Sequence, residues 1–227
     1  MFRVEDKYLC TEIQMFLLER RIEAMLSADS NQLQNGYCIT SVYFDDSSNS
    51  CFYDSQAGHY IRQKYRIRIY NANYDLIKLE VKCKKNNRVK KNSKIITYDQ
   101  MRTLMSGNEI EDSDPMTDSP ITMFNMAIAQ RNLRPKVIVE YDRNAYVYPP
   151  GNVRITFDRN VRAGWDMNRF LQKREQNYHY LEEGRIVEVK YDELLPGFIE
   201  RMLETGNMQQ ISFSKYCLCR EKGGCYR

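Results

Sequence analysis

Charged and apolar residues alternate in Lys64-Tyr65-Arg66-Ile67-Arg68-Ile69. Successive side chains of a β-strand point to opposite faces, so this segment predicts a strand with one basic face and one apolar face. The same period of two recurs in four further segments: Glu5-Asp6-Lys7, Glu80-Val81-Lys82-Cys83-Lys84, Arg154-Ile155-Thr156-Phe157-Asp158 and Glu188-Val189-Lys190. One such strand is an ordinary solvated edge. Several, nearly all combining cations with a carboxylate, predict strands gathered around a charged interior that suits a polyanion and an accompanying metal ion.

The composition is that of a folded domain whose positive charge is concentrated rather than abundant. The 227 residues are 42% hydrophobic and 28% charged, and 34 Lys and Arg against 30 Asp and Glu give a net charge of +4. We expect a single domain over residues 1–220 and a disordered tail over 221–227. No segment approaches the roughly 20 apolar residues that span a bilayer. The N-terminus lacks the apolar region of a signal peptide, so a cytoplasmic location is expected.

Cysteine and histidine usage argues against several common kinds of site. The seven cysteines form no CxxC pair, which favours scattered reduced thiols. Only two histidines, His59 and His179, are present. Histidine-based zinc sites and Ser-His or Cys-His catalysis are therefore poor candidates.

The pattern along the chain predicts about eight strands, mostly joined by hairpins, with helices inserted between them. Strands are expected over 2–8, 37–44, 60–70, 75–84, 136–148, 153–158, 185–191 and 211–219. Helices are expected over 11–25, 97–105, 119–132 and 197–204. The Lys- and Asn-rich segment 82–94 is expected to be a mobile loop or a guide for an anionic ligand. The predicted fold is α+β: an antiparallel eight-stranded β-barrel with a charged lumen and helices packed outside, the inverse of the usual small barrel.

Eight short motifs follow one another along the chain. They are Arg3-Val4-Glu5-Asp6-Lys7-Tyr8, Ser41-Val42-Tyr43-Phe44-Asp45, Lys64-Tyr65-Arg66-Ile67-Arg68, Leu79-Glu80-Val81-Lys82, Tyr141-Asp142-Arg143-Asn144-Ala145-Tyr146, Val153-Arg154-Ile155-Thr156-Phe157-Asp158, Ile186-Val187-Glu188-Val189-Lys190 and Ser212-Phe213-Ser214-Lys215-Tyr216. Together they resemble the bacterial VTC domains, the polyphosphate polymerase branch of the triphosphate tunnel metalloenzymes. The similarity is collinear from residue 3 to about residue 219.

The resemblance implies an eight-stranded tunnel lined with Lys, Arg and Glu, which agrees with the alternation. It implies that seven cations line the tunnel and hold phosphates: Lys7, Arg66, Arg68, Lys82, Arg143, Arg154 and Lys215. Glu188 would be the metal-binding carboxylate for Mn²⁺ or Mg²⁺, and Glu5 could assist because it shares a face with Lys7. Glu80 and Lys190 would also face inward. The residues expected to carry catalysis are Lys7, Arg66, Arg68, Glu188 and Lys215.

The activity that the resemblance implies is transfer of the γ-phosphate of ATP onto phosphate or a growing polyphosphate. Its expected partners are ATP, phosphate and polyphosphate, and a separate membrane partner stays open. Eukaryotic relatives carry a second lysine where this chain has Ser212, so one phosphate contact is missing or supplied by another residue.

Two alternative functions stay open. Hydrolysis of tripolyphosphate or a nucleoside triphosphate needs the same tunnel charge. Tripolyphosphatases usually begin with an E-x-E-x-K motif, and Arg3 stands at its first Glu, which favours the polymerase branch. The second alternative is a non-catalytic module that binds polyphosphate or single-stranded nucleic acid. A nucleic-acid groove would interleave aromatic residues with the cations, whereas Ile67, Ile69 and Val81 do so here, so no nucleic-acid partner is expected.

Overall fold

The computed structural model describes residues 3–32, 36–86, 88–114, 116–181, 185–204, 208–212 and 214–224. Their strands are β1 (Val4–Leu9), β2 (Ser27–Ala28), β3 (Tyr37–Asp45), β4 (Ile61–Tyr70), β5 (Asn73–Lys85), β6 (Arg88–Ile96), β7 (Arg134–Tyr148), β8 (Val153–Gly164), β9 (His179–Tyr180), β10 (Ile186–Tyr191) and β11 (Gln209–Gln210). Their α-helices are α1 (Glu12–Met25), α2 (Ser50–Gln56), α3 (Tyr98–Met105), α4 (Pro120–Arg131), α5 (Met167–Leu171), α6 (Gly197–Leu203) and α7 (Lys215–Gly224). A 3-10 turn, η1 (Pro150–Asn152), joins β7 to β8.

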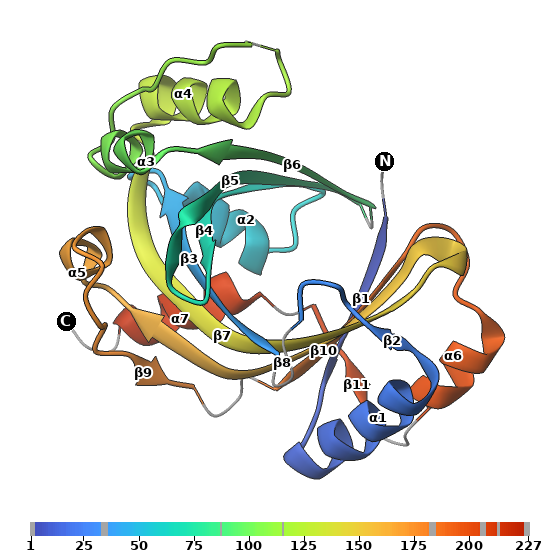
Figure 1. Cartoon of the computed structure of the whole chain (residues 1–227). Coiled ribbons are helices and arrows are strands. Elements are labelled where there is room, and N and C mark those ends of the chain that lie inside the picture. The colour runs from blue at the N-terminus through green and yellow to red at the C-terminus, as the bar shows by residue number, and fades with distance from the viewer. Residues whose placement is uncertain are drawn as a thin grey trace.

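All described strands belong to one antiparallel sheet, which curves strongly (Figure 1). Its order is β11-β1-β10-β8-β7-β3-β4-β5-β6, and β2 and β9 add to β7 and β8. The register places Arg66 opposite Glu80 on β5, and Arg68 opposite Ser41 on β3. The concave face, here called the lumen, therefore carries the charged side chains that alternate along each strand.

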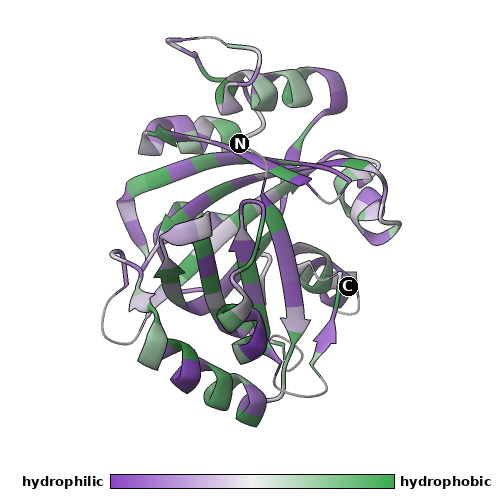
Figure 2. Cartoon of the chain, turned by 90° about the vertical axis from the view of Figure 1, so that its right-hand side faces the viewer, coloured by the Kyte–Doolittle hydropathy of each residue, from purple (hydrophilic) through white to green (hydrophobic). Residues whose placement is uncertain are grey.

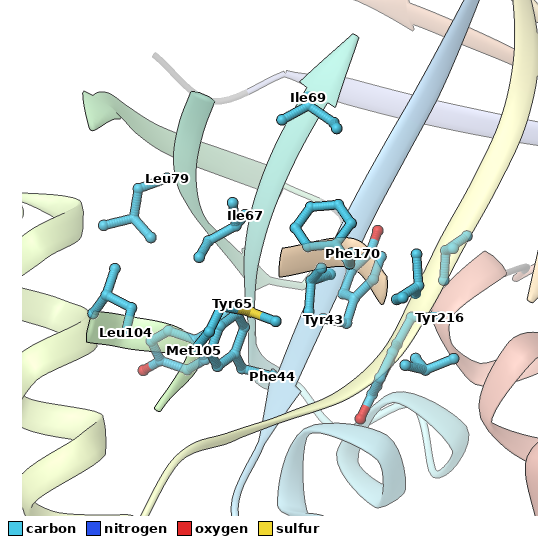
Figure 3. Packing of buried hydrophobic residues seen from close by; sticks show 14 of the residues in the cluster. Tyr43, Phe44, Tyr65, Ile67, Ile69, Leu79, Leu104, Met105, Phe170 and Tyr216 are labelled. Atoms are coloured by element: carbon cyan, nitrogen blue, oxygen red, sulfur yellow. The ribbon is translucent and has the colours of Figure 1, made fainter. Parts of the chain in front are cut away.

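The apolar side chains of the same strands face outward and are covered by helices, as the alternation predicts. On β4, Tyr65, Ile67 and Ile69 are almost fully buried, and they belong to a cluster with Leu104 of α3 and Phe124 of α4. Figure 3 shows Ile67, Leu79, Leu104 and Met105 packed together in this cluster.

A second apolar cluster lies under α1 and α6. Leu18 and Ile22 of α1 pack with Phe157 of β8 and Val189 of β10. The alternation of polar and apolar residues along the strands is visible in Figure 2. The apolar cores thus lie outside the curved sheet, which leaves the lumen to polar side chains.

The predicted closed eight-stranded barrel is wrong in two respects. The described sheet has eleven strands, because β2, β9 and β11 add two residues each. It is also not closed: β1 and β6 lie at opposite ends of an eight-strand path. In the described part of the chain, one backbone bridge, Arg3–Val89, with N–O distances of 3.4 Å in both directions, joins these ends.

Two local predictions also fail. The mobile-loop alternative for segment 82–94 is wrong, because β5 runs to Lys85 and β6 begins at Arg88, and lysines such as Lys91 pair with carboxylates. The other alternative, that this segment guides an anionic ligand, stays a prediction. The strand expected over 211–219 is wrong, because helix α7 begins at Lys215. Ser214 caps its first turn: the Ser214 hydroxyl accepts a hydrogen bond from the Cys217 N–H at 3.3 Å. This helix continues to Gly224, past the expected domain boundary at residue 220. Helix α2 was not predicted.

Six cysteines lie in the described residues, and all six are free thiols. None of the described helices has the length and apolarity needed to cross a membrane.

The buried carboxylate of Asp45 ties α2 and α7 to the end of β3. It accepts hydrogen bonds from the N–H groups of Cys51 and Phe52 at 2.9 and 3.1 Å, and from the Tyr216 hydroxyl at 2.5 Å. Asp45 is 0% exposed, so these donors have no access to water as a substitute acceptor. Asp45 is therefore one anion that fixes the helix beginning at Lys215 against the sheet.

Replacing Asp45 by Ala is expected to lower the free energy of unfolding by about 3 kcal/mol, because buried donors lose a charged acceptor. Urea denaturation, monitored by circular dichroism, measures this change in the free energy of unfolding. Asp75→Ala, at an exposed position of β5, serves as the control and should change stability by less than about 0.5 kcal/mol. Equal stability of the two variants would contradict this role of Asp45.

Candidate functional site

Side chains of the lumen line one cavity of about 150 Å³. Its cations are Lys7, Arg62, Lys64, Arg66, Arg68, Lys82, Lys84, Arg143, Lys190 and Lys215. Among the described residues, two carboxylates, Glu5 and Glu188, line it with them. This excess of positive charge within a concave, partly desolvated space attracts a polyanion.

Arg66 and Arg68 are held in place by a carboxylate that lies behind them. Glu80 is 0% exposed, accepts from Arg66 Nε at 2.7 Å and from Lys91 Nζ at 3.0 Å, and lies 3.8 Å from Arg68 Nε. Burial raises the pKa of Glu80, but Arg66, Arg68 and Lys91 outweigh it and keep the pKa well below its usual value. Glu80 does face inward, as expected, yet it orients the arginines rather than lining the cavity.

Asp158 orients Arg143 of β7 and Lys215 of α7 in the same way as Glu80 orients Arg66 and Arg68. Arg143 forms a two-pronged pair with it, with N–O distances of 2.5 and 2.7 Å, and Lys215 Nζ lies 2.5 Å from its Oδ2. Asp158 is 0% exposed. The sequence predicted Lys215 on a strand; it is the first residue of α7, and the ion pair with Asp158 brings it to the lumen.

Glu5 and Glu188 lie close together, bridged by a lysine. Lys190 Nζ lies 3.3 Å from Glu5 Oε1 and 3.1 Å from Glu188 Oε2. Lys82 Nζ donates to both oxygens of Glu5 at 2.9 and 2.6 Å, and Lys7 Nζ lies 3.7 Å from Glu188. Positively and negatively charged side chains thus alternate across the lumen from β5 through β1 to β10.

The lysines keep both carboxylates ionised. Burial and Glu188 raise the pKa of Glu5, but Lys190, Lys82 and Lys7 outweigh them, and its pKa falls to about 2. Burial also raises the pKa of Glu188, and Lys190, Lys7, Lys82 and Arg143 together hold it well below its usual value. Both groups are therefore anions throughout the physiological range.

These two carboxylates fit a divalent ion of the hard, oxygen-binding type. Mg²⁺ is commonly bound through one or two carboxylates, with phosphate oxygens and water completing its coordination. Glu5 and Glu188, which both pair with the ammonium group of Lys190, offer such a pair of carboxylates. No group of three or more His, Cys, Asp or Glu side chains suited to a metal occurs among the described residues. The donor set thus fits a metal that arrives with a phosphate ligand, not one caged by protein.

Besides Glu80, one other predicted site residue, Arg154, lies outside the cavity lining. Arg154 Nη1 lies 3.1 Å from Asp29 Oδ2, and its Nη2 donates to the Tyr37 hydroxyl at 3.0 Å. Arg154 shares a strand face with Asp158, as the alternation predicts, but Asp29 draws its side chain away. The other predicted cations, Lys7, Arg66, Arg68, Lys82, Arg143, Lys190 and Lys215, are brought together.

Sequence reasoning missed three lining cations: Arg62, Lys64 and Lys84. The signal was present, because all three continue the period of two along β4 and β5. Ser212, which stands where eukaryotic relatives have lysine, also lines the cavity.

Comparison with known proteins agrees with this geometry. The family model described as "VTC domain" matches residues 2–222. No curated protein sequence matches.

Solved structures of similar fold cover nearly the whole chain. One is a Hippeastrum protein named as an adenylyl cyclase and reported to have a dominant triphosphatase activity; its TM-score is 0.58 at 14% identity, over 98% of this chain and 96% of that one. A Bacillus halodurans protein named as an adenylate cyclase gives 0.56 at 11% identity, over 94% and 96%. The PH1819 protein of Pyrococcus horikoshii gives 0.52 at 15% identity, over 97% and 99%. At these identities the similarity is one of fold.

Proposed function

The chain belongs to the VTC domain family of triphosphate tunnel enzymes, and on this premise we propose that it is an ATP-dependent polyphosphate polymerase. The reaction transfers the γ-phosphate of ATP to phosphate or to a polyphosphate end and releases ADP. Enzymes of this tunnel class depend on a divalent metal, and we propose Mn²⁺ or Mg²⁺ at Glu5 and Glu188. The observation that carries the proposal is the lumen itself, in which ten cations surround two ionised carboxylates.

The lumen residues suit phosphoryl transfer because that reaction needs positioning and charge compensation more than covalent chemistry. Arg66 and Arg68 present guanidinium groups that Glu80 holds in fixed orientation, and such forks donate parallel hydrogen bonds to phosphate oxygens. Arg143 of β7 and Lys215 of α7, oriented by Asp158, add further positive charge. A divalent ion bound by Glu188 and Glu5 would offset negative charge on the transferred group.

The ion pairs of the carboxylates favour a phosphate acceptor over water. Water must lose a proton as it attacks, and an efficient general base has a pKa near the working pH. Glu5 and Glu188 are each paired with lysines and remain anions far below neutral pH. A phosphate acceptor brings an anionic oxygen and needs no such base. Hydrolysis of a triphosphate in the same lumen is the second candidate, and the triphosphatase reported for the Hippeastrum protein is the observation in its favour.

The two candidates separate in one assay. The purified protein is incubated with ATP and Mn²⁺ while ADP, free phosphate and polyphosphate are measured together. We expect ADP to form with polyphosphate of increasing length. ADP with an equal amount of free phosphate would identify a hydrolase, and triphosphate binding without turnover would identify a binding module.

Polyphosphate affinity is expected to fall as the pH rises through about 8. Burial lowers the pKa of Lys64 to about 8. The neighbouring cations Lys7, Arg62 and Arg66 lower it further, whereas Cys217 raises it. Lys64 is therefore charged below pH 8 and neutral above it, so attraction is lost on the alkaline side, by up to about tenfold per pH unit for one linked proton. Titration calorimetry in buffers of different ionisation enthalpy should detect proton uptake on binding near pH 8.

Lys64→Arg provides the control for this pH dependence. Arginine keeps its charge throughout the range, so the decline centred near pH 8 should disappear in the variant. A wild-type affinity that stays constant between pH 7 and 9 would contradict the titration of Lys64.

A further inference from the structure

The lumen cations that lack a carboxylate partner are gathered at one end. Lys7, Arg66, Arg68, Lys82, Arg143, Lys190 and Lys215 all form ion pairs. Among the described residues, no carboxylate forms an ion pair with Arg62, Lys64 or Lys84. Arg62 donates to the backbone carbonyl of His59 at 3.1 Å, and Lys64 to the Ser214 hydroxyl at 2.7 Å. All three line the cavity. We call them the mouth cluster.

The strand register forces these charges together. Arg62 on β4 lies directly opposite Lys84 on β5, and Lys64, two residues further along, lies opposite Lys82. Like charges directly opposite each other in a sheet are destabilising. Burial, Arg62 and Lys7 lower the pKa of Lys84, against weaker opposing effects of Glu5 and Asp6. The mouth cluster thus concentrates unneutralised positive charge that an anionic ligand would relieve.

The distance between the mouth cluster and Arg66 and Arg68 sets the length of that ligand. Arg62 precedes Arg66 by four residues on the same strand, which corresponds to about 13 Å of extended backbone. Three linked phosphate groups are shorter than this. A triphosphate held at Arg66 and Arg68 therefore leaves the outer pair, Arg62 and Lys84, for a longer chain.

We propose that Arg62 and Lys84 form an outer anion site that binds the part of a polyphosphate chain extending beyond a triphosphate held at Arg66 and Arg68. The inference rests on the proposed function, and it names two residues that would give the protein a preference for longer polyphosphate chains. The protein should therefore bind long-chain polyphosphate more tightly than tripolyphosphate.

The test compares two ligands and two double variants. Affinities for tripolyphosphate and for a long-chain polyphosphate are measured by calorimetry at several salt concentrations. In Arg62→Gln/Lys84→Gln, the ratio of long-chain to tripolyphosphate affinity should fall at least tenfold. The slope of log affinity against log salt for the long chain should decrease by about 1.4, or about 0.7 per lost contact for a flexible single chain.

Lys85→Gln/Arg88→Gln is the matched control. These residues are also directly opposed cations, on β5 and β6, but they are exposed and lie outside the cavity lining. Their replacement removes the same charge and should leave the affinity ratio within about twofold of wild type. An equal fall of the ratio in both double variants, or an unchanged ratio in Arg62→Gln/Lys84→Gln, would overturn the outer site. Wild-type protein that binds neither ligand would instead overturn the proposed function.

Discussion

Replacing Glu188 by Gln should lower kcat by about 10²–10³, the cost typical of removing one group that stabilises charge in a transition state. Glu188 is 5% exposed, faces Lys190 and Arg143 at 3.1 and 3.6 Å, and is one of two lumen carboxylates that fit a divalent ion. Gln keeps the shape of the side chain but loses the charge that attracts the metal. Triphosphate affinity without metal should not fall, because an anion has been removed from the lumen.

The experiment measures kcat at a series of Mn²⁺ concentrations, with circular dichroism to check the fold. Glu200→Gln, on the exposed face of α6, removes the same charge away from the lumen and should keep wild-type turnover. Undiminished turnover of Glu188→Gln would show that Glu188 does not act as a metal ligand. Turnover restored by higher Mn²⁺ would support its role as a metal ligand.

Replacing Arg66 by Ala should weaken triphosphate binding about 100-fold and also lower the free energy of unfolding by about 3 kcal/mol. Arg66 donates to Glu80, which is fully buried and would lose its closest cation. Breaking a buried ion pair from one side costs about 3–5 kcal/mol; the lower value is expected here because Lys91 stays at 3.0 Å. The binding loss follows from the missing guanidinium and should shrink as salt concentration rises.

A second variant separates the two effects of Arg66. Arg66→Lys keeps a cation beside Glu80, so that this buried carboxylate is not left without its closest partner, but it removes the two-pronged guanidinium. Stability should recover while triphosphate binding stays weak. Recovery of binding together with stability would mean that any cation suffices at this position, and an unchanged affinity of Arg66→Ala would count against the lumen as the phosphate site.

The period of two was enough to predict the charged lumen and the outer apolar cores. Arg66 and Ile67 lie on opposite faces of β4 because adjacent strand residues must do so. The bounds of helix α1 were predicted equally well, but its buried face was not: Ile13, Phe16 and Leu17, which follow helical spacing, are exposed, and Met15, Leu18 and Ile22 are buried instead. These are local properties of the chain.

The failures concern contacts between distant residues. Arg154 leaves the cavity because Asp29, 125 positions earlier, pairs with it. The lysines of β6 looked like those of a solvated loop, but the segment forms a strand by pairing with β5, and its lysines pair with Glu80 and Asp112. Residues 211–219 were expected to form a strand, but the hydrogen bond of Tyr216 to Asp45 and the ion pair of Lys215 with Asp158 fit a helix. Apart from the capping residue Ser214, no local pattern contains this information.

The single bridge between Arg3 and Val89 bears on how a long molecule reaches the lumen. A molecule enters a fully closed ring only by threading a free end through it. Here two hydrogen bonds of 3.4 Å, together with the Lys82–Glu5 contact, fasten one side of the wall to the other. Such hydrogen bonds contribute about 1 kcal/mol each, so the Lys82–Glu5 ion pair is the stronger fastening between the two edges. Parting of these contacts would let the proposed polyphosphate substrate be laid in sideways, and would let a product leave without being pulled out end first.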